Sequence, residues 1–368
     1  MAAEGIRRGE CLGVGKSQGL ILNRPFWLFC AGEDSGDILG EAVVREISEK
    51  GLGTIGSGGA RMQSAGLRPV FSFDDLPVNG FFDVLLHGKK LRRNFSILKK
   101  LLQDRNCRGL VAVDYPGFNL GLMELALKLD KRVIYVEPPQ IWAWKPKRIR
   151  KFLTPKARSN VEIRAMFDVE CEAYRKYGLH VKKIPHPFDS VSKNAFPLPR
   201  ENIALLYPGS RLAQIRRNFR LYLQIACKLK EKKLSVRFIA SRDFTEKFLR
   251  QNLSIDFPVF LSPKSAEERF VLLSQAKLVV AAPGSAVVEA FKAKTFCVAA
   301  SRIDPLTYIL GKFFIRTKYL TIPNIERERC GKPPVVCELV KSSLADCESH
   351  ASDVLRIFDA QLQVPFKT

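Results

Sequence analysis

Acidic and small polar residues gather in a short glycine-containing loop near the start of the chain. This loop, 32–37 (GEDSGD), follows the apolar run 26–31 and precedes a helical pattern that begins at Ile38. Glycines at such a turn allow close backbone approach to a ligand, and amides at a helix start bind anions or sugar hydroxyls. The alternative is helix capping by Asp34 or Ser35. Because capping accounts for one acid and the loop holds three, we favour a binding role.

A further acid, Asp114, follows the strand-like run 109–113. Ligands of open parallel sheets bind beyond the carboxyl ends of the strands, where a carboxylate is placed to act as a general base. Asp is also a common turn residue beside Pro116 and Gly117. Spacing alone does not separate these two roles.

Two Gly-Ser loops follow strand-like runs in the second half of the chain. In the first loop, Gly209 allows the backbone to approach a ligand closely. Ser210 and the amides that follow it can donate hydrogen bonds to a phosphate, and the guanidinium of Arg211 can bind it in a bidentate manner. The second loop contains Gly284 and Ser285 and leads into a helix with Glu289, which is placed to bind a ribose diol. One such loop is usually only a turn. Two of them at equivalent strand ends predict a nucleotide diphosphate site.

Aromatic and basic residues alternate in the segment 141–158, which contains no acid. This pattern is typical of a membrane interface or of single-stranded nucleic acid binding. The candidate lipid-binding residues are Trp142, Trp144, Lys145, Lys147 and Arg148. A second basic stretch, 89–108, has apolar residues at helical spacing, which fits membrane contact and a solvated charged helix face equally well. Both stretches lie in the first half, which we therefore expect to be the membrane side.

The four histidines show no metal-ligand spacing, so no metal site and no cofactor are predicted. They are His87, His180, His186 and His350. His186, between two prolines, is more typical of a structural residue.

Alternating strand-like and helical patterns must position all these groups. Strand-like runs occupy 26–31, 109–113, 132–136, 202–207, 235–240, 277–282 and 295–300. Such alternation predicts parallel sheets covered by helices, and two sets of it predict an α/β protein with two Rossmann-like domains facing across a cleft. The expected parts are a flexible extension (1–24), a membrane-side domain (25–188), a linker (189–200), a nucleotide-binding domain (201–345), and a C-terminal helix (346–368) that packs back on the first domain.

Charge and length restrict the function. The 368 residues carry 60 Lys and Arg against 37 Asp and Glu, a net charge of +23 at pH 7. This excess favours anionic partners, and the 46% hydrophobic content excludes a disordered tail protein. No stretch reaches the roughly 18 apolar residues of a membrane-spanning helix, so membrane contact is expected to be peripheral.

Several longer segments resemble the lipid-A-disaccharide synthase family of inverting GT-B glycosyltransferases. The resemblance covers about 26–339, nearly the whole chain beyond the extension. Its most specific segments are AGEDSGDILG (31–40), VDYPGFN (113–119), VIYVEPPQIWAWKPKRIRK (133–151), LLYPGSR (205–211) and PGSAVVEA (283–290).

The resemblance implies transfer of 2,3-diacylglucosamine from UDP-2,3-diacylglucosamine to 2,3-diacylglucosamine 1-phosphate, with release of UDP. It implies a metal-independent enzyme of lipid A biosynthesis, cytoplasmic and peripheral on the anionic inner membrane surface. Asp114 would be the base and Arg211 would stabilise the leaving UDP. Glu33, Ser35 and Asp37 would lie near the acceptor, with Glu33 counted among the catalytic residues, and Asn324 near the nucleotide.

Two other functions fit parts of the sequence. Another GT-B enzyme acting on UDP-GlcNAc, a cell-wall transferase or an epimerase, would use the same nucleotide loops. A nucleic-acid binder would fit the charge, but the chain shows no nucleic-acid motif, so nucleic acid is not an expected partner. A homodimer is an expected assembly.

Overall fold

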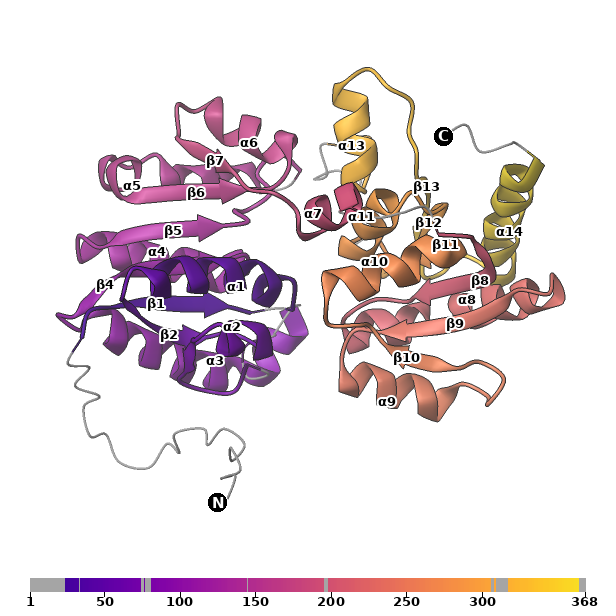
Figure 1. The fold of residues 1–368 in the computed structure, drawn as a ribbon, viewed down its shortest axis with the longest axis horizontal. Helices are drawn as coiled ribbons and strands as arrows, with labels where there is room; N and C mark the ends of the chain where they lie inside the picture. Colours follow the sequence, from indigo (N-terminus) through magenta and orange to yellow (C-terminus); the bar gives the residue numbers. More distant parts are fainter. Residues whose placement is uncertain are drawn as a thin grey trace. The chain divides into compact units, whose positions relative to one another are not determined.

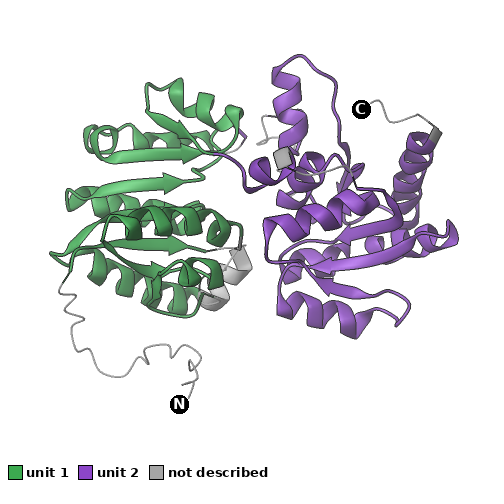
Figure 2. Cartoon of the chain, in the orientation of Figure 1, with its two compact units in different colours: residues 1–141, 145–184 green, residues 142–144, 185–368 purple. Residues whose placement is uncertain are grey.

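The computed structural model describes residues 24–32, 34–73, 76, 81–143, 145–194, 198–305, 308 and 317–363. Glu33, Trp144 and nearly all of the predicted extension lie outside the described residues. The chain forms two compact units (Figure 2). Unit 1 consists of 1–141 and 145–184, and unit 2 of 142–144 and 185–368.

Unit 1 contains a parallel seven-stranded sheet in the order β3-β2-β1-β4-β5-β6-β7 (Figure 1). Its strands are β1 (Phe26–Ala31), β2 (Gly53–Ser57), β3 (Arg68–Pro69), β4 (Cys107–Val113), β5 (Arg132–Val136), β6 (Val161–Ala165) and β7 (Val181–Lys183). Its helices are α1 (Asp34–Glu49), α2 (Ala60–Ser64), α3 (Phe81–Leu102), α4 (Pro116–Lys128), the 3-10 helix Pro146–Phe152, α5 (Pro155–Asn160) and α6 (Asp168–Arg175).

Alternate residues of the central strand β1 build two hydrophobic cores, one on each face of the sheet. Leu28 packs in the core that includes α3 and α4, whereas Phe29 packs in the core that includes α1 and α2. Successive side chains of a strand point to opposite faces, so a strand buried on both sides needs an unbroken apolar run. The run FWLFCA meets this requirement, and every residue of β1 is buried.

Unit 2 contains a parallel six-stranded sheet in the order β10-β9-β8-β11-β12-β13. Its strands are β8 (Glu201–Tyr207), β9 (Ser235–Ala240), β10 (Val259–Leu261), β11 (Ala276–Ala281), β12 (Cys297–Ile303) and β13 (Cys337–Ser342). Its described helices are α7 (Pro187–Asn194), α8 (Leu212–Glu231), α9 (Asp243–Asn252), α10 (Ala266–Gln275), α11 (Ser285–Lys292), α13 (Ile322–Arg329) and α14 (Cys347–Gln363).

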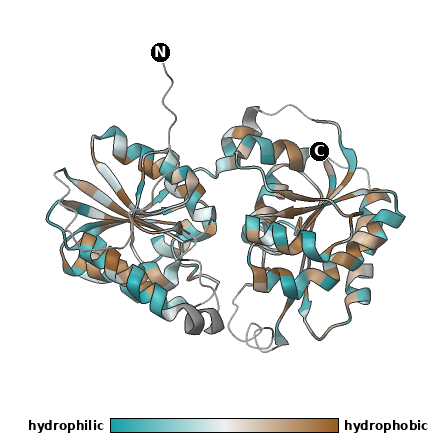
Figure 3. Cartoon of the chain, turned by 90° about the horizontal axis from the view of Figure 1, so that it is seen from below, coloured by the Kyte–Doolittle hydropathy of each residue, from teal (hydrophilic) through white to brown (hydrophobic). Residues whose placement is uncertain are grey.

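The sheet of unit 2 is also covered on both faces. One core joins β8 to α8, α9 and α14, and the other joins it to α7, α10 and α11. Figure 3 shows the result in both units, where hydrophobic residues concentrate on the strands and the helices carry hydrophilic residues as well. The predicted α/β class with two Rossmann-like domains is confirmed at the level of each unit.

Two segments differ from the sequence-based expectation. The segment 189–200, predicted as a linker, contains most of helix α7, whose Phe188 is fully buried in the core of unit 2. The C-terminal helix α14 was expected to pack on the first domain, and this is wrong. Its apolar residues Ala351, Val354 and Phe358 lie in the core that contains α8 of unit 2.

In the described part of the chain, none of the helices combines the length and the apolar character needed to cross a membrane.

Candidate active site

The predicted site residues of unit 1 follow the two central strands of its sheet. From β1 the chain continues outward through β2 and β3, and from β4 it continues outward in the opposite direction through β5, β6 and β7. The boundary between β1 and β4 is therefore a topological switch point, where open α/β sheets bind their ligands. Gly32 follows β1 and Asp114 follows β4, on strands paired in register from Trp27 with Gly109 to Ala31 with Val113.

These two loops are in direct contact. A Cβ atom added to Gly32 would lie 2.6 Å from Cδ1 of Tyr115, so only glycine fits at this position without moving the ring. The buried amide of Asn119 fastens the same strand ends. Its Nδ2 donates to the carbonyl oxygens of Cys30 and Val113, both at 3.1 Å, and of Asp114 at 2.8 Å.

Asp114 is held in an unusual backbone conformation. Its φ is 46° and that of Tyr115 is 47°, so two consecutive non-glycine residues adopt the left-handed region. Such conformations cost free energy and persist where surrounding contacts fix them. Here the Asp114 N–H donates to the carbonyl of Val136 at 2.8 Å, and Tyr115 Oη donates to the carbonyl of Leu76 at 2.7 Å. The half-buried Asp114 is thus presented from a rigid backbone.

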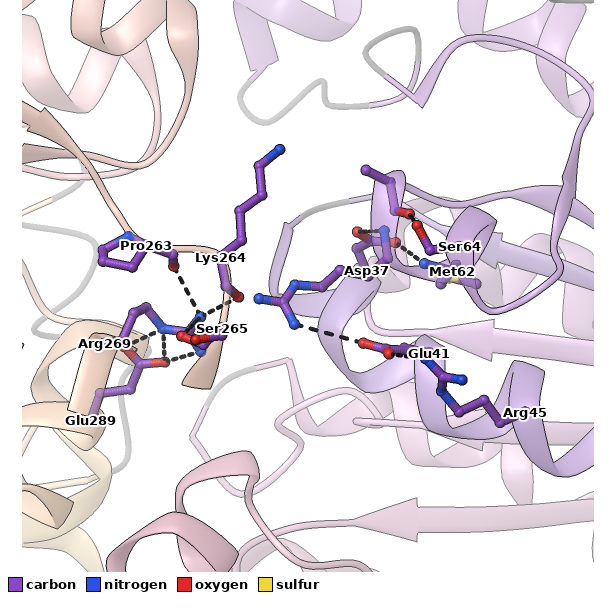
Figure 4. A network of polar contacts seen from close by, with 12 residues as sticks. Asp37, Glu41, Arg45, Met62, Ser64, Pro263, Lys264, Ser265, Arg269 and Glu289 are labelled. Atoms are coloured by element: carbon purple, nitrogen blue, oxygen red, sulfur yellow. Dashed lines mark hydrogen bonds and ion pairs between the residues drawn. The ribbon is translucent and has the colours of Figure 1, made fainter. Parts of the chain in front are cut away.

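Asp37 has a structural role in unit 1. It is 7% exposed, and its carboxylate accepts the N–H groups of Arg61 and Met62, each at 3.1 Å, at the start of α2 (Figure 4). These contacts cap α2 from α1, an arrangement that stabilises the exposed amides of a helix start. Ser35, in contrast, is exposed in the first turn of α1. Of the two, Ser35 is the one open to a ligand.

The two Gly-Ser loops of unit 2 also lie at a topological switch point. β8 and β11 are neighbours, and the chain continues from them in opposite directions across the sheet. Tyr207 pairs with Ala281, and the N–H of Ala282 donates to the carbonyl of Tyr207 at 2.9 Å. The loops that follow these strands therefore start side by side, as the sequence predicted.

The first loop ends at the start of helix α8. Gly209 has a φ of +136°, and a Cβ there would lie 2.5 Å from Oε1 of Gln214, so the turn depends on glycine. The buried Asn218 anchors the loop by donating from Nδ2 to the carbonyl of Pro208 at 2.7 Å. Ser210 and Arg211 are exposed, and Arg211 is the N-cap residue of α8. A guanidinium beside helix-start amides is a favourable environment for an anion.

The second loop presents the start of α11. Gly284 and Ser285 are both exposed, and α11 begins at Ser285. The backbone of Gly284 is extended, with a φ of 160°, so its conformation alone does not require glycine. The exposed amides and the hydroxyl of this turn are available to a phosphate.

Glu289 is paired with a buried arginine that the sequence analysis did not identify. Arg269 is 5% exposed, and its Nε donates to Oε1 and Oε2 of Glu289 at 3.1 and 3.3 Å (Figure 4). The Nη1 of Arg269 donates to three backbone carbonyls at the start of α10, those of Pro263, Lys264 and Ser265. The arginine thus fixes the orientation of the Glu289 carboxylate relative to the loop before α10.

The side-chain amide of Asn324 is fully hydrogen-bonded within unit 2. It is 0% exposed, its Nδ2 donates to the carbonyl of Val336 and to Oε1 of Glu338, and its Oδ1 accepts the N–H groups of Val335 and Val336. With every hydrogen-bonding atom of the amide engaged, the side chain holds α13 against the segment before β13. This arrangement assigns Asn324 to the framework of the site.

Lys147 and Arg148 of the candidate lipid-binding residues lie within the 3-10 helix Pro146–Phe152, and the others precede it in the sequence. Lys145, its N-cap residue, and Lys147 are exposed, whereas Trp142 and Arg148 are half-buried. Ile149 and Phe152 attach this helix to the core of unit 1. The second basic stretch forms much of α3, where Leu98 and Leu102 are fully buried. The exposed cations of α3 are Lys89, Lys90, Arg92, Arg93, Lys99 and Lys100.

The sequence analysis did not identify site residues whose hydrogen-bond partners are far away in the sequence. Arg269 lies 20 residues before Glu289, and Asn119 reaches the carbonyl of Cys30 across 89 residues. Neither spacing follows a helical or strand period, so only the fold brings these residues together. Among the described residues, no three His, Cys, Asp or Glu side chains cluster as a metal site would require.

Comparison with known proteins identifies the family. Residues 27–352 match the Lipid-A-disaccharide synthetase family. The chain belongs to this family. A lipid-A-disaccharide synthase from Coxiella burnetii is 30% identical over 349 residues, which cover 90% of this chain and 88% of the relative. The resemblance seen in the sequence is thereby confirmed, and the chain is a glycosyltransferase of lipid A biosynthesis.

Solved structures of lower identity share the fold of this synthase family member. UDP-GlcNAc 2-epimerase from Methanocaldococcus jannaschii, in complex with UDP-GlcNAc and UDP, gives a TM-score of 0.55 at 11% identity, covering 92% of this chain and 99% of that chain. UGT89C1 from Arabidopsis thaliana, complexed with UDP-L-rhamnose, gives a TM-score of 0.53 at 11% identity, and the match covers 91% of this chain and 89% of that chain. These likenesses confirm the GT-B fold.

Proposed function

We propose that this protein transfers 2,3-diacylglucosamine from UDP-2,3-diacylglucosamine to 2,3-diacylglucosamine 1-phosphate. The products are a β-1,6-linked disaccharide 1-phosphate and UDP. The observation that carries the proposal is the placement of all four predicted loops at the two switch points, within a chain of the lipid-A-disaccharide synthase family. Each switch point then serves one substrate.

The switch point of unit 2 would bind the UDP part of the donor. The amides of Gly209, Ser210, Gly284 and Ser285 offer hydrogen bonds to the diphosphate, and Glu289 accepts hydrogen bonds from the ribose diol. Arg269 supports this role because it holds the Glu289 carboxylate in one orientation. Asn324 would contribute indirectly, by holding α13 in place.

The switch point of unit 1 would bind and activate the acceptor. The Asp114 carboxylate takes the proton from the 6-hydroxyl of the acceptor as that oxygen attacks the anomeric carbon of the donor. Attack from the face opposite UDP inverts the configuration. Gly32 and Ser35 would contact the acceptor sugar, and Glu33 is proposed beside them. Asp37 would act by fixing α2.

The bond between the anomeric carbon and the diphosphate breaks in the same step, and UDP leaves with the electron pair. Negative charge grows on the diphosphate oxygen as this bond lengthens. Arg211 and the amides at the start of α8 would stabilise that charge, which is the kind of interaction that accelerates the chemical step rather than binding alone.

The exposed cations of unit 1 would bring the enzyme to an anionic membrane surface. The exposed Lys145 and Lys147 and the half-buried Arg148, together with Trp142 and Trp144, would contact the lipid headgroups and the acyl chains of the substrates. The basic face of α3 would add to the attraction, since each cation near an anionic surface contributes about 1 kcal/mol. A homodimer stays a prediction, which the molar mass in solution would test.

A UDP-release assay with two donors tests the proposal. With the acylated acceptor present, UDP-2,3-diacylglucosamine should release UDP and UDP-GlcNAc should not. The alternative, another GT-B enzyme acting on UDP-GlcNAc, predicts the reverse preference. Mass spectrometry of the lipid product distinguishes transfer from simple hydrolysis of the donor.

Site variants with matched controls test the residue roles. Asp114→Asn and Arg211→Ala should each lower kcat by at least about 100-fold. The control for the first is Asp130→Asn, because exposed Asp130 also has a positive φ, 54°. The control for the second is Arg220→Ala, an exposed arginine on α8. Full activity of Asp114→Asn and Arg211→Ala would refute the assigned roles.

A further inference from the structure

Glu289, which we assign to the ribose of the donor, forms an ion pair with Arg269 of α10 inside unit 2. The pair is shielded from water, since the side chain of Arg269 is 6% exposed and that of Glu289 is 14% exposed. Nε of the arginine donates to both carboxylate oxygens, at 3.1 and 3.3 Å (Figure 4). The carboxylate is therefore held on one side by the arginine, while part of the side chain stays accessible to a ligand.

The guanidinium of Arg269 is itself fixed by several contacts. Nη1 donates to the carbonyl oxygens of three residues that lead into α10, at 3.2, 2.9 and 3.1 Å, namely Pro263, Lys264 and Ser265. The ring of the fully buried Phe188 has its centroid 5.5 Å from Cζ of the arginine. Because a guanidinium is planar and rigid, these contacts also fix the direction in which Nε points. A lysine ammonium group on its flexible chain could not make the same set of contacts.

The position of Glu289 on α11 relates it to the second Gly-Ser loop. α11 begins at Ser285, and Glu289 lies four residues further on. Residues four apart lie on the same face of a helix, with about 5–6 Å between their Cβ atoms. In a nucleoside diphosphate, the ribose is bonded directly to the diphosphate through its 5′-oxygen. A diphosphate at the start of α11 would therefore bring its ribose close to the carboxylate of Glu289.

We propose that Arg269 determines the sugar specificity of the donor site: by holding the Glu289 carboxylate in one orientation, it makes the site selective for ribonucleotides over 2′-deoxyribonucleotides. This inference rests on the proposed contact between Glu289 and the ribose diol. A fixed carboxylate shielded from water accepts hydrogen bonds from both hydroxyls without first being ordered, and it loses one of them when the 2′-hydroxyl is absent. A mobile carboxylate would be hydrated instead, and the two sugars would bind more equally.

Binding of two nucleotides to the protein measures this selectivity. The Kd values of UDP and 2′-deoxy-UDP are obtained by isothermal titration calorimetry, and their ratio is the readout. In the wild type, 2′-deoxy-UDP should bind at least about tenfold more weakly, because a hydrogen bond to a charged group is lost. Glu289→Ala removes the acceptor, so its two Kd values should agree within about twofold.

Substitutions of Arg269 separate the role of the arginine from that of the carboxylate. Arg269→Lys keeps the charge but not the planar set of donors, and its Kd ratio should fall below about threefold. Arg269→Gln is a second variant with the same expected result, and thermal unfolding checks that both variants are folded. Arg250→Lys is the matched control, because Arg250 of α9 also donates to a carboxylate, that of Glu246, and to a backbone carbonyl, that of Val259. Its ratio should equal that of the wild type.

A double variant tests whether the arginine acts through the carboxylate. If it does, adding Arg269→Lys to Glu289→Ala should change the Kd of UDP by less than about twofold, since the group that the arginine positions is already gone. A general structural effect of Arg269→Lys would instead weaken UDP binding further in the double variant.

Each outcome decides the proposal. A wild-type ratio in both Arg269 variants, with the ratio lost in Glu289→Ala, would overturn the role of the arginine and leave Glu289 as the ribose ligand. Similar Kd values of the two nucleotides in the wild-type protein would refute the ribose contact itself and the inference with it. Further weakening of UDP binding in the double variant would also overturn the inference, because the arginine would then act on the site as a whole.

Discussion

At the scale of single residues, the site depends on a close contact between two loops. Asp114 and Tyr115 adopt left-handed conformations, and the ring of Tyr115 occupies the space that a side chain at position 32 would need. Sequence spacing placed Gly32 and Asp114 after their strands but gave no reason to expect this contact. It also did not reveal that Asp37 and Asn324 are engaged within the protein, because hydrogen-bond partners depend on the fold.

The contact predicts that Gly32→Ala impairs the enzyme. The added methyl group would meet Cγ and Cδ1 of Tyr115 at 2.7 and 2.6 Å, so the turn that carries Asp114 must shift. We expect kcat to fall by about tenfold or more and Tm by a few degrees. Gly117→Ala is the control, because a Cβ there meets nothing within 4 Å. Steady-state kinetics and thermal unfolding of both variants check this, and wild-type behaviour of Gly32→Ala would contradict it.

At the scale of elements, apolar runs predicted the central strands well. The runs 26–31, 132–136 and 235–240 coincide with β1, β5 and β9. Strands with charged residues were missed, among them β6, where Glu162 and Arg164 form an ion pair at 2.7 Å. Helix α7 was missed because its prolines suggested a linker. Proline is compatible with the first helical position, however, and Pro187 occupies it in α7.

An ion pair between elements predicts acid sensitivity. Arg164 on β6 is 5% exposed and donates to both carboxylate oxygens of Glu46 on α1, at 2.6 and 3.2 Å. The hydrogen bonds to Arg164 lower the pKa of Glu46 from 4.5 to about 2. Because the folded-state value is depressed, the stabilisation is present above pH 4.5 and is lost as the pH falls toward 2.

Glu46→Gln should therefore lower Tm by a few degrees at pH 7, and its difference from the wild type should shrink as the pH falls from about 4.5. Thermal unfolding between pH 7 and 3 measures this, with exposed Glu49→Gln as the control. A difference that is constant over this range would show that the ion pair does not set the acid sensitivity.

At the scale of the whole molecule, each unit repeats one design, a parallel sheet with its candidate ligand loops at a switch point. This repetition was predictable, because strand-like and helical patterns alternate in the same way in both halves of the sequence. The GT-B class followed from the resemblance to the synthase family. The packing of α14 was not predictable, because the apolar residues of an amphipathic helix do not show which hydrophobic core the helix covers. Its apolar face covers the core with α8 of unit 2.

The net charge of +23 predicts salt-dependent binding to anionic membranes. The protein should co-sediment with phosphatidylglycerol-containing vesicles at low salt and bind them less at about 0.5 M salt, because salt screens surface charges. It should not co-sediment with phosphatidylcholine vesicles, because these carry no net charge. Replacing Lys145 and Lys147 by Gln should weaken the binding, whereas replacing the exposed Lys233 and Lys247 of unit 2 should have little effect. Equal binding to both vesicle types would contradict the electrostatic basis.

The structure of the protein with bound UDP tests the central claim most directly. We predict that the diphosphate contacts the amides of Gly284 and Ser285 and the guanidinium of Arg211, and that the ribose diol contacts Glu289. A nucleotide bound anywhere other than at the ends of β8 and β11 would contradict the assignment of unit 2 as the donor site.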